Sequence, residues 1–239
     1  MFHKRKFLNR ESSSLYAKNP KKKLCLSFKK QKVIPWKVAK ESVQIEFIEE
    51  YFELSEDARS GQCHIVLYDP VHQLHNSESA KCRIAKGEEF FLKSNTGRNR
   101  ITAMWAINPL SLKFSGLIIE DYCDKETTKQ ALRNIRDDYP DGKPIFIFLD
   151  NAAYNRSYEV QDYAIELWIT LCYLPPYSPN LNLIERLWKF MKKILVKNRY
   201  YETFKEFREA FIDFFVNLWN YSEDLKRIFS YSFQILKAA

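Results

Sequence analysis

Glycine is scarce in this chain, and its scarcity excludes two common kinds of phosphate chemistry. Only five of the 239 residues are glycine, and the patterns Gly-x-x-x-x-Gly-Lys and Gly-x-Gly-x-x-Gly are both absent. Each pattern relies on glycine to let the backbone approach a phosphate closely. The sequence therefore excludes nucleotide hydrolysis at a P-loop and chemistry on a bound dinucleotide.

Long apolar runs and paired cysteines are also lacking. No run approaches the roughly 18 apolar residues that span a bilayer, and no apolar segment follows the charges of residues 1–6. We therefore expect neither a membrane span nor a secretory signal. The five cysteines are scattered, without a Cys-x-x-Cys pair. This usage predicts reduced thiols in a cytoplasmic protein.

Apolar and charged residues are plentiful, but the charge is unevenly distributed. Hydrophobic residues make up 46% of the chain and aromatic residues 15%, which predicts one sizeable packed domain. The net charge is +8, yet residues 1–40 hold 13 Lys and Arg against a single acid, Glu11. This distribution predicts a basic arm that contacts phosphate groups, although a solubilising tail explains the composition equally well.

Apolar runs and helical periodicity predict an α/β domain. We expect strands at residues 65–69, 90–92, 101–107, 117–119, 145–149 and 171–174, and helices at 40–54, 125–137, 158–168, 183–197 and 204–221. The early strands follow one another, whereas the later ones alternate with helices. That order predicts a mixed sheet with helices on both faces. The last helix has a Thr203–Glu206 capping box and an aromatic stripe that predicts core packing.

Three acids lie where a strand ends or a helix begins. Asp69 ends the first expected strand, Asp150 follows the apolar run 145–149, and Glu185 opens a helix after a proline-rich loop. If the two strands are neighbours, their carboxylates meet at one edge of the sheet. Three carboxylates can bind two hard cations about 3.5–4 Å apart, as phosphodiester-cutting sites do. Taken singly, each acid is more often an ordinary turn or helix-cap residue.

The donor atoms favour magnesium over zinc. Carboxylate oxygens suit Mg²⁺, and no cysteine accompanies the acids. A zinc site built from His64, His72, His75 and Asp69 is the alternative. Its His-x-x-His spacing is weak support, because no compact third and fourth ligand accompanies it. Hydrogen bonding within the loop is the simpler interpretation of these histidines.

The neighbours of the three acids resemble those of a known family. Residues 68–76 (Tyr-Asp-Pro-Val-His-Gln-Leu-His-Asn), 149–157 (Leu-Asp-Asn-Ala-Ala-Tyr-Asn-Arg-Ser) and 174–188 (Leu-Pro-Pro-Tyr-Ser-Pro-Asn-Leu-Asn-Leu-Ile-Glu-Arg-Leu-Trp) carry the likeness. Together they resemble the DDE transposases of mariner-type bacterial insertion sequences, the insertion sequence 630 family. The likeness extends over roughly residues 24–220, and the third block is its most specific part.

This resemblance implies a fold, a site and an activity. It implies a ribonuclease H-like catalytic domain at residues 56–239, preceded by a basic arm and linker at residues 1–55. Asp69, Asp150 and Glu185 would be the catalytic, metal-binding triad for two Mg²⁺ or Mn²⁺ ions. Metal-activated water would cleave DNA at the element ends, and the freed 3′-hydroxyl would attack target DNA, commonly at a TA step. The resemblance also implies a homodimer in the transposition complex, in a cytoplasmic bacterial protein that associates with the nucleoid when bound to DNA.

The chain departs from the family pattern in three places. Asn155 stands where many relatives have histidine, and Leu183 where many have proline; neither change removes a ligand. Full-length relatives carry helix-turn-helix domains ahead of the catalytic domain, where this chain has only its basic arm. We therefore expect a DNA-binding domain from an upstream reading frame, or a truncated copy. A nuclease without strand transfer and an inactive remnant that only binds DNA remain the alternatives.

Overall fold

The computed structural model describes residues 35, 37–96, 98–119, 122–230 and 233–237 of the chain. Most of the predicted basic arm, residues 1–34, lies outside the described residues. The division between arm and catalytic domain at residue 55 stays a prediction. Among the described residues, no helix is both long enough and apolar enough to cross a bilayer.

Five strands form one mixed sheet, in the order β3-β2-β1-β4-β5. The strands are β1 (His64–Leu74), β2 (Arg100–Ile107), β3 (Phe114–Ile119), β4 (Ile145–Leu149) and β5 (Ile169–Tyr173). The β1–β2 and β2–β3 pairs are antiparallel, whereas β1–β4 and β4–β5 are parallel. The predicted mixed sheet is therefore confirmed.

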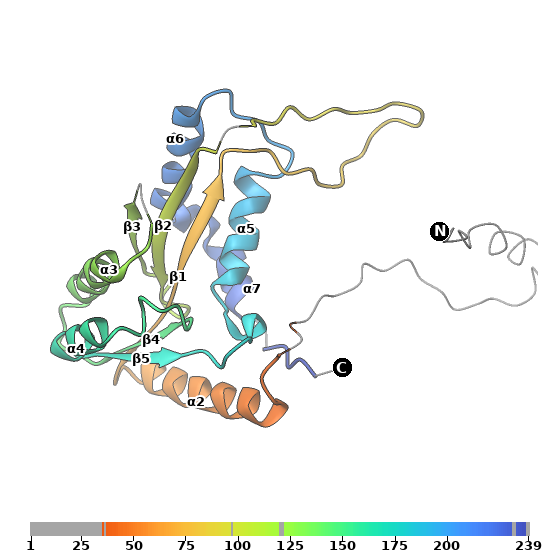
Figure 1. Ribbon diagram of the computed structural model, residues 1–239. Coiled ribbons are helices and arrows are strands. Elements are labelled where there is room, and N and C mark those ends of the chain that lie inside the picture. The colour runs from red at the N-terminus through yellow and green to blue at the C-terminus, as the bar shows by residue number, and fades with distance from the viewer. Residues whose placement is uncertain (1–34, 36, 97, 120–121, 231–232, 238–239) are drawn as a thin grey trace, which may run out of the picture. The chain divides into compact units, whose positions relative to one another are not determined.

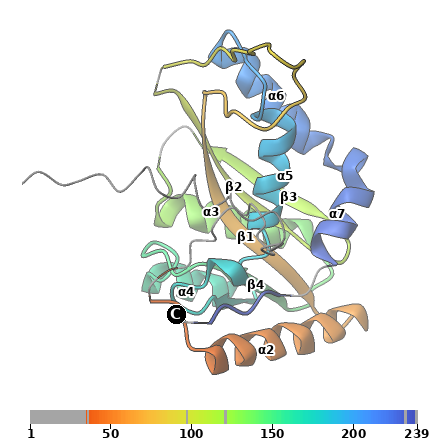
Figure 2. The ribbon, with the colours of Figure 1, turned by 90° about the vertical axis from the view of Figure 1, so that its right-hand side faces the viewer.

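Helices cover both faces of this sheet (Figures 1 and 2). One face packs against α3 (Lys125–Asp138) and α4 (Tyr158–Glu166). The other face packs against α2 (Glu41–Arg59), α5 (Glu185–Leu195), α6 (Phe204–Val216) and α7 (Ser222–Phe229). Successive strand residues point to opposite faces, so the continuous apolar runs of β1 and β4 supply both layers of the core. The prediction of helices on both faces is confirmed.

Helix α2 packs on the sheet through aromatic side chains. Phe47 and Tyr51 contact Phe148 of β4 edge to face, with ring centroids 5.8 and 5.0 Å apart. All three side chains are at most 7% exposed. The helix predicted at residues 40–54 therefore exists, continues to Arg59, and contributes to the hydrophobic core.

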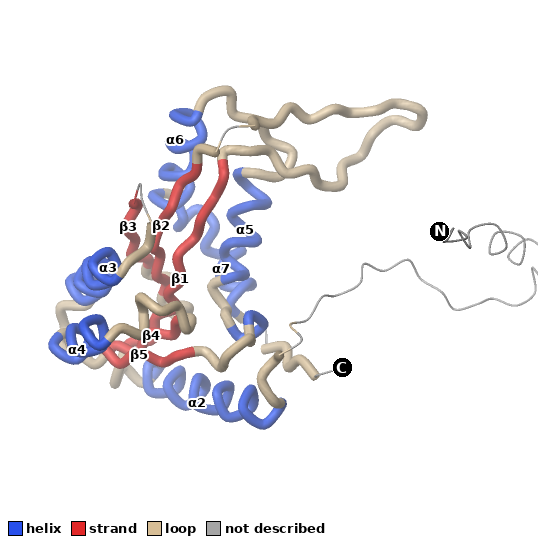
Figure 3. Tube along the Cα trace, viewed as in Figure 1, coloured by secondary structure: helices blue, strands red, loops and turns tan. Residues whose placement is uncertain are grey.

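The strand predicted at residues 90–92 is wrong. These residues lie in the long connection between β1 and β2, which extends away from the sheet (Figure 3). Phe90 is 64% exposed and Phe91 83% exposed, and neither takes part in a ladder. A short apolar run forms a strand only when a neighbouring strand supplies hydrogen bonds and cover, and here there is none.

The single helix predicted at residues 204–221 is interrupted. Helix α6 ends at Val216, a short 3-10 turn follows at Leu218–Tyr221, and α7 begins at Ser222. The side-chain amide of Asn217 donates hydrogen bonds to the backbone carbonyl of Asp213, at 3.1 Å, and to the Asp213 carboxylate, at 2.8 Å. These bonds close the last turn of α6. The predicted capping box and the buried aromatic stripe are confirmed.

Candidate active site

Asp69 lies within β1, at the point where this strand loses one of its two neighbours. β1 pairs with β4 only through residues His64 to Leu67, but it continues beside β2 as far as Leu74. The prediction that Asp69 ends its strand is therefore wrong. Pro70 lacks an N–H group, yet β1 has a partner on only one side there, where a proline is tolerated. The end of β4 leaves space beside Asp69.

Asp150 follows β4 directly and comes to the same edge. β1 and β4 are adjacent and parallel, with Leu67 opposite Phe148 in the register. Both of these side chains belong to the core layer that faces α5 and α6. Asp69 and Asp150 follow these residues by two positions, and residues two apart along a strand point to the same face. Asp69 and Asp150 therefore point toward the side of the sheet that α5 covers.

Glu185 reaches this edge as the first residue of α5. The loop before Glu185 packs into the core through Leu181, Leu183 and Ile184, whose side chains are at most 3% exposed. Leu183 thus fills the core at the position where many relatives have proline. The side chain of Asn151 also donates to the Leu174 carbonyl, so the loops after β4 and β5 are joined.

All three predicted acids line one pocket of about 500 Å³. The rest of its wall comes from the loops after β4 and β5: Asn151, Ala152, Leu174, Pro175, Pro176, Tyr177, Ser178, Pro179 and Asn182. Within the described part of the chain, no three His, Cys, Asp or Glu side chains are grouped closely enough to hold one ion. The acids therefore share a pocket without converging on a single point.

Asp69 is the most buried of the three, at 8% exposed. Its Oδ2 accepts a 2.7 Å hydrogen bond from the indole N–H of Trp188, and its Oδ1 accepts a 3.3 Å bond from Asn182. Burial raises the pKa of the Asp69 carboxyl from 3.8 to about 7. The two hydrogen bonds oppose that rise, while the charges of Glu185 and Asp150 add to it.

Asp150 is held by its own loop. Its Oδ1 accepts hydrogen bonds from the Ala152 backbone N–H, at 3.1 Å, and from the Asn155 side chain, at 2.8 Å. Asn155 is fully buried, and its backbone carbonyl accepts a 2.8 Å bond from the Tyr173 hydroxyl. The side-chain N–H of Asn155 thus donates to Asp150. Because an amide does not titrate, it is a donor at any pH.

The three acids have no basic partner among the described residues, whose ion pairs all lie elsewhere. Grouped carboxylates without counter-charge are unfavourable unless protons or cations neutralise them. All the donor atoms are oxygens, the ligand type that Mg²⁺ and Mn²⁺ prefer. The residues present therefore fit a divalent cation of this class.

The histidines of the zinc alternative have separate hydrogen-bonding partners. His64 bonds to Asp141 at 2.8 Å, His72 to the Thr102 hydroxyl at 3.1 Å, and His75 to the Tyr201 carbonyl at 3.0 Å. No metal-binding group containing them occurs among the residues that the structure describes. Each histidine therefore makes a hydrogen bond, but to a partner in another segment of the chain rather than within its own loop.

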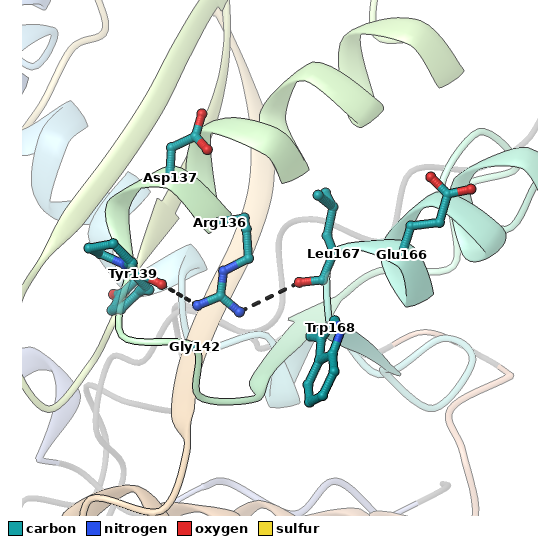
Figure 4. A pocket seen from close by; sticks show the side chains of 8 residues that line it. Arg136, Asp137, Tyr139, Gly142, Glu166, Leu167 and Trp168 are labelled. Atoms are coloured by element: carbon teal, nitrogen blue, oxygen red, sulfur yellow. Dashed lines mark hydrogen bonds between the residues drawn. The ribbon is translucent and has the colours of Figure 1, made fainter.

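A second pocket, of about 520 Å³, lies away from the acids at the ends of α3 and α4 (Figure 4). Its most prominent group is Arg136, which donates to the backbone carbonyls of Lys143 at 2.9 Å and of Leu167 at 3.5 Å, and to that of Tyr139. The guanidinium therefore closes helix ends and turns. We assign this pocket a structural role.

Sequence reasoning did not identify two residues that contact the acids, Trp188 and Asn182, as functional. Both stand in the third block of the family resemblance, but neither carries a charge that draws attention. Trp188 lies three residues after Glu185 on a helix, and residues with this spacing share a face. That spacing is the signal that predicts its proximity to the pocket.

Comparison with known proteins identifies the family. The sequence model described as "DDE superfamily endonuclease" matches residues 64–208, and the chain belongs to this family. An uncharacterized protein of Sinorhizobium fredii (strain NBRC 101917 / NGR234), y4pE/y4sA, is 32% identical over 108 residues, which are 43% of this chain and 77% of that protein. Membership of the DDE superfamily, which the resemblance implied, is thus confirmed.

Solved structures of Mos1 transposase share the fold. The match to the mariner Mos1 paired-end complex with Mg covers 90% of this chain and 68% of the Mos1 chain, at 15% identity and a TM-score of 0.64. The Mos1 strand transfer complex matches at 16% identity and a TM-score of 0.63, over 86% of this chain. The chain spans 62% of the length of that Mos1 chain. The predicted ribonuclease H-like fold is confirmed.

Proposed function

We propose that this chain is the catalytic domain of a DNA transposase, which cuts DNA at the ends of a mobile element and joins them to a target. Asp69, Asp150 and Glu185 are its catalytic residues. One observation carries the proposal: in a member of the DDE endonuclease family, three acids from β1, the β4 loop and α5 line a single pocket and have no basic partner among the described residues.

The same three acids are the proposed ligands of two divalent cations, Mg²⁺ or Mn²⁺. Such ions, when bound, activate a water molecule and stabilise the leaving oxygen of a phosphodiester. Mos1 paired-end complexes have been solved with Mg and with Mn, which supports this choice. On the protein side, Asn155 and the Ala152 N–H orient Asp150, and the buried loop before α5 fixes Glu185.

The proposed partner is DNA, both element ends and a target with a TA step, bound by a homodimer. Mos1 transposase has been solved as a paired-end complex with its left transposon end, which supports the pairing of ends. On α5, Lys189 and Lys193 are exposed and suited to phosphate contacts, whereas Lys192 pairs with Glu78 at 3.3 Å. The basic arm adds phosphate contacts, and a domain from an upstream reading frame would recognise the element ends.

A joining assay tests this function. The purified chain is mixed with Mg²⁺, a plasmid and a labelled duplex that carries the element end with a free 3′-hydroxyl. A transposase joins the label covalently to the plasmid, because its site places the 3′-hydroxyl against a target phosphate. Glu185→Ala should yield no joined product, while Glu166→Ala, an exposed acid on α4, should match the wild type.

The other outcomes identify the alternatives. Nicked plasmid without joined label indicates a ribonuclease H-like nuclease without strand transfer. DNA binding with neither nicks nor joined product indicates a remnant that only binds DNA. If end recognition requires a separate DNA-binding domain, supplying that domain together with the chain restores joining. Joining that survives in Glu185→Ala contradicts the assignment of the site.

A further inference from the structure

Helix α5 presents two different groups to the pocket. Glu185 is its first residue, and Trp188 follows three positions later on the same face. Trp188 is 4% exposed, and its indole packs edge to face against Phe215 of α6, with ring centroids 6.3 Å apart. The indole is therefore held in place by the core, with its N–H directed at Asp69.

Both carboxylate oxygens of Asp69 are bonded to the segment that carries Glu185. Trp188 donates to Oδ2 at 2.7 Å and Asn182 donates to Oδ1 at 3.3 Å. Asp69 belongs to the central strand β1, whereas residues 182–188 belong to the loop and helix above the sheet. These two bonds are thus a polar connection from β1 to the loop and first turn of α5, beside the hydrophobic core to which Trp188 belongs.

We propose that Trp188 is a positioning residue, which fixes Asp69 relative to Glu185 so that the two acids bind a divalent cation together. This inference rests on the proposed function, since it concerns the same site. An indole suits the task, because its N–H donates without bringing a positive charge that would compete with the cation. The bond also turns Asp69 to one orientation, which limits the entropy that cation binding must remove.

A second tryptophan provides a matched control. Trp105 of β2 lies directly opposite Asp69 in the β1–β2 register and is 7% exposed. It stacks on the same Phe215, with ring centroids 4.3 Å apart, yet its indole N–H has no hydrogen-bond partner among the described residues. Two buried tryptophans therefore adjoin Asp69, and only one donates to it.

The test compares Trp188→Phe with Trp105→Phe in the full chain without DNA. Mn²⁺ binding is measured by calorimetry and by the electron paramagnetic resonance signal of free Mn²⁺, and folding by circular dichroism. Loss of the indole N–H in Trp188→Phe should weaken Mn²⁺ binding by about 10-fold, as loss of a ligand's hydrogen-bonding partner commonly does. Trp105→Phe should change the affinity by less than about 2-fold.

Asn182→Ala is the second variant, in case Trp188→Phe does not fold. It removes the longer bond to Asp69 with little loss of packing and should weaken Mn²⁺ binding in the same direction. Unchanged Mn²⁺ affinity in Trp188→Phe, or an equal loss of affinity in Trp105→Phe, would overturn the inference. The proposed function would still be supported if Mn²⁺ binding is lost in Asp150→Ala. No Mn²⁺ binding by the wild type would overturn both.

Discussion

Asp69 shows what a grouped acidic site costs the folded protein. A carboxyl buried to this extent, near two other acids, is unfavourable in its charged form. Burial raises its pKa to about 7, even though Trp188 and Asn182 donate to it. The acid is retained in spite of this cost, which is typical of functional rather than structural residues.

The raised pKa of Asp69 predicts how stability changes with pH when no divalent cation is present. Below its ordinary pKa of 3.8 the carboxyl is protonated in both states. As the pH rises toward 7, the unfolded chain releases this proton while the folded chain retains it, so the contribution to stability falls and is lost above the folded pKa. Asp69→Asn lacks this titration.

Urea unfolding in EDTA measures the effect. The free energy of unfolding of the wild type, minus that of Asp69→Asn, should fall between pH 5 and pH 8 by on the order of 2 kcal/mol. The subtraction removes groups that titrate in both proteins. A difference that stays constant over this range would contradict the burial of Asp69.

Some residues of the site can be predicted from the sequence, and others are recognised only in the folded structure. The three acids follow from their blocks of sequence, because each block sets polar residues at fixed distances from its acid, with prolines added in the first and third blocks. The roles of Trp188 and Asn155 do not follow. Their contribution lies in single hydrogen bonds to Asp69 and Asp150, and these depend on which elements meet in the folded chain.

At the scale of elements, the strands buried on both faces were the most predictable. Residues 101–107 and 145–149 were predicted almost to the residue, since continuous apolar runs are typical of central strands. The second half of β1 does not follow from the sequence, because Pro70 and the polar residues after it suggest a loop. What keeps this half in the sheet is β2, a partner that the local sequence does not reveal.

Packing between elements predicts a specific effect at Gly116 of β3. This glycine lies opposite Trp105 in the β2–β3 register, and a Cβ atom there would be 1.4 Å from Cζ3 of the indole. Gly116→Ala therefore forces the ring out of its stack with Phe215. We expect a loss of roughly 1–3 kcal/mol in the free energy of unfolding, the usual cost of overpacking a core.

A second substitution separates overpacking from other causes. In a Trp105→Leu background the ring is absent, so the added methyl group should cost much less than it does in the wild type. This double-mutant cycle is measured by urea unfolding of the four proteins. Equal costs of Gly116→Ala in both backgrounds would show that the indole does not occupy the space beside Gly116.

At the scale of the whole molecule, charge is divided between two parts of the chain. Residues 1–40 carry all of the basic excess, and the rest, which contains the three acids, is net acidic. We interpret this as a division between an arm that attracts the DNA backbone and a domain that cuts it. The family match at residues 64–208 covers the second part only.

Metal-dependent nicking of supercoiled DNA by Asp150→Ala tests the central claim most directly. Wild-type chain should convert supercoiled plasmid to the nicked form in Mg²⁺ or Mn²⁺ and not in EDTA. Asp150→Ala should give no nicked product above the EDTA background while its circular dichroism spectrum matches that of the wild type. A folded Asp150→Ala protein that nicks the plasmid as fast as the wild type would contradict the assignment of this pocket as the active site.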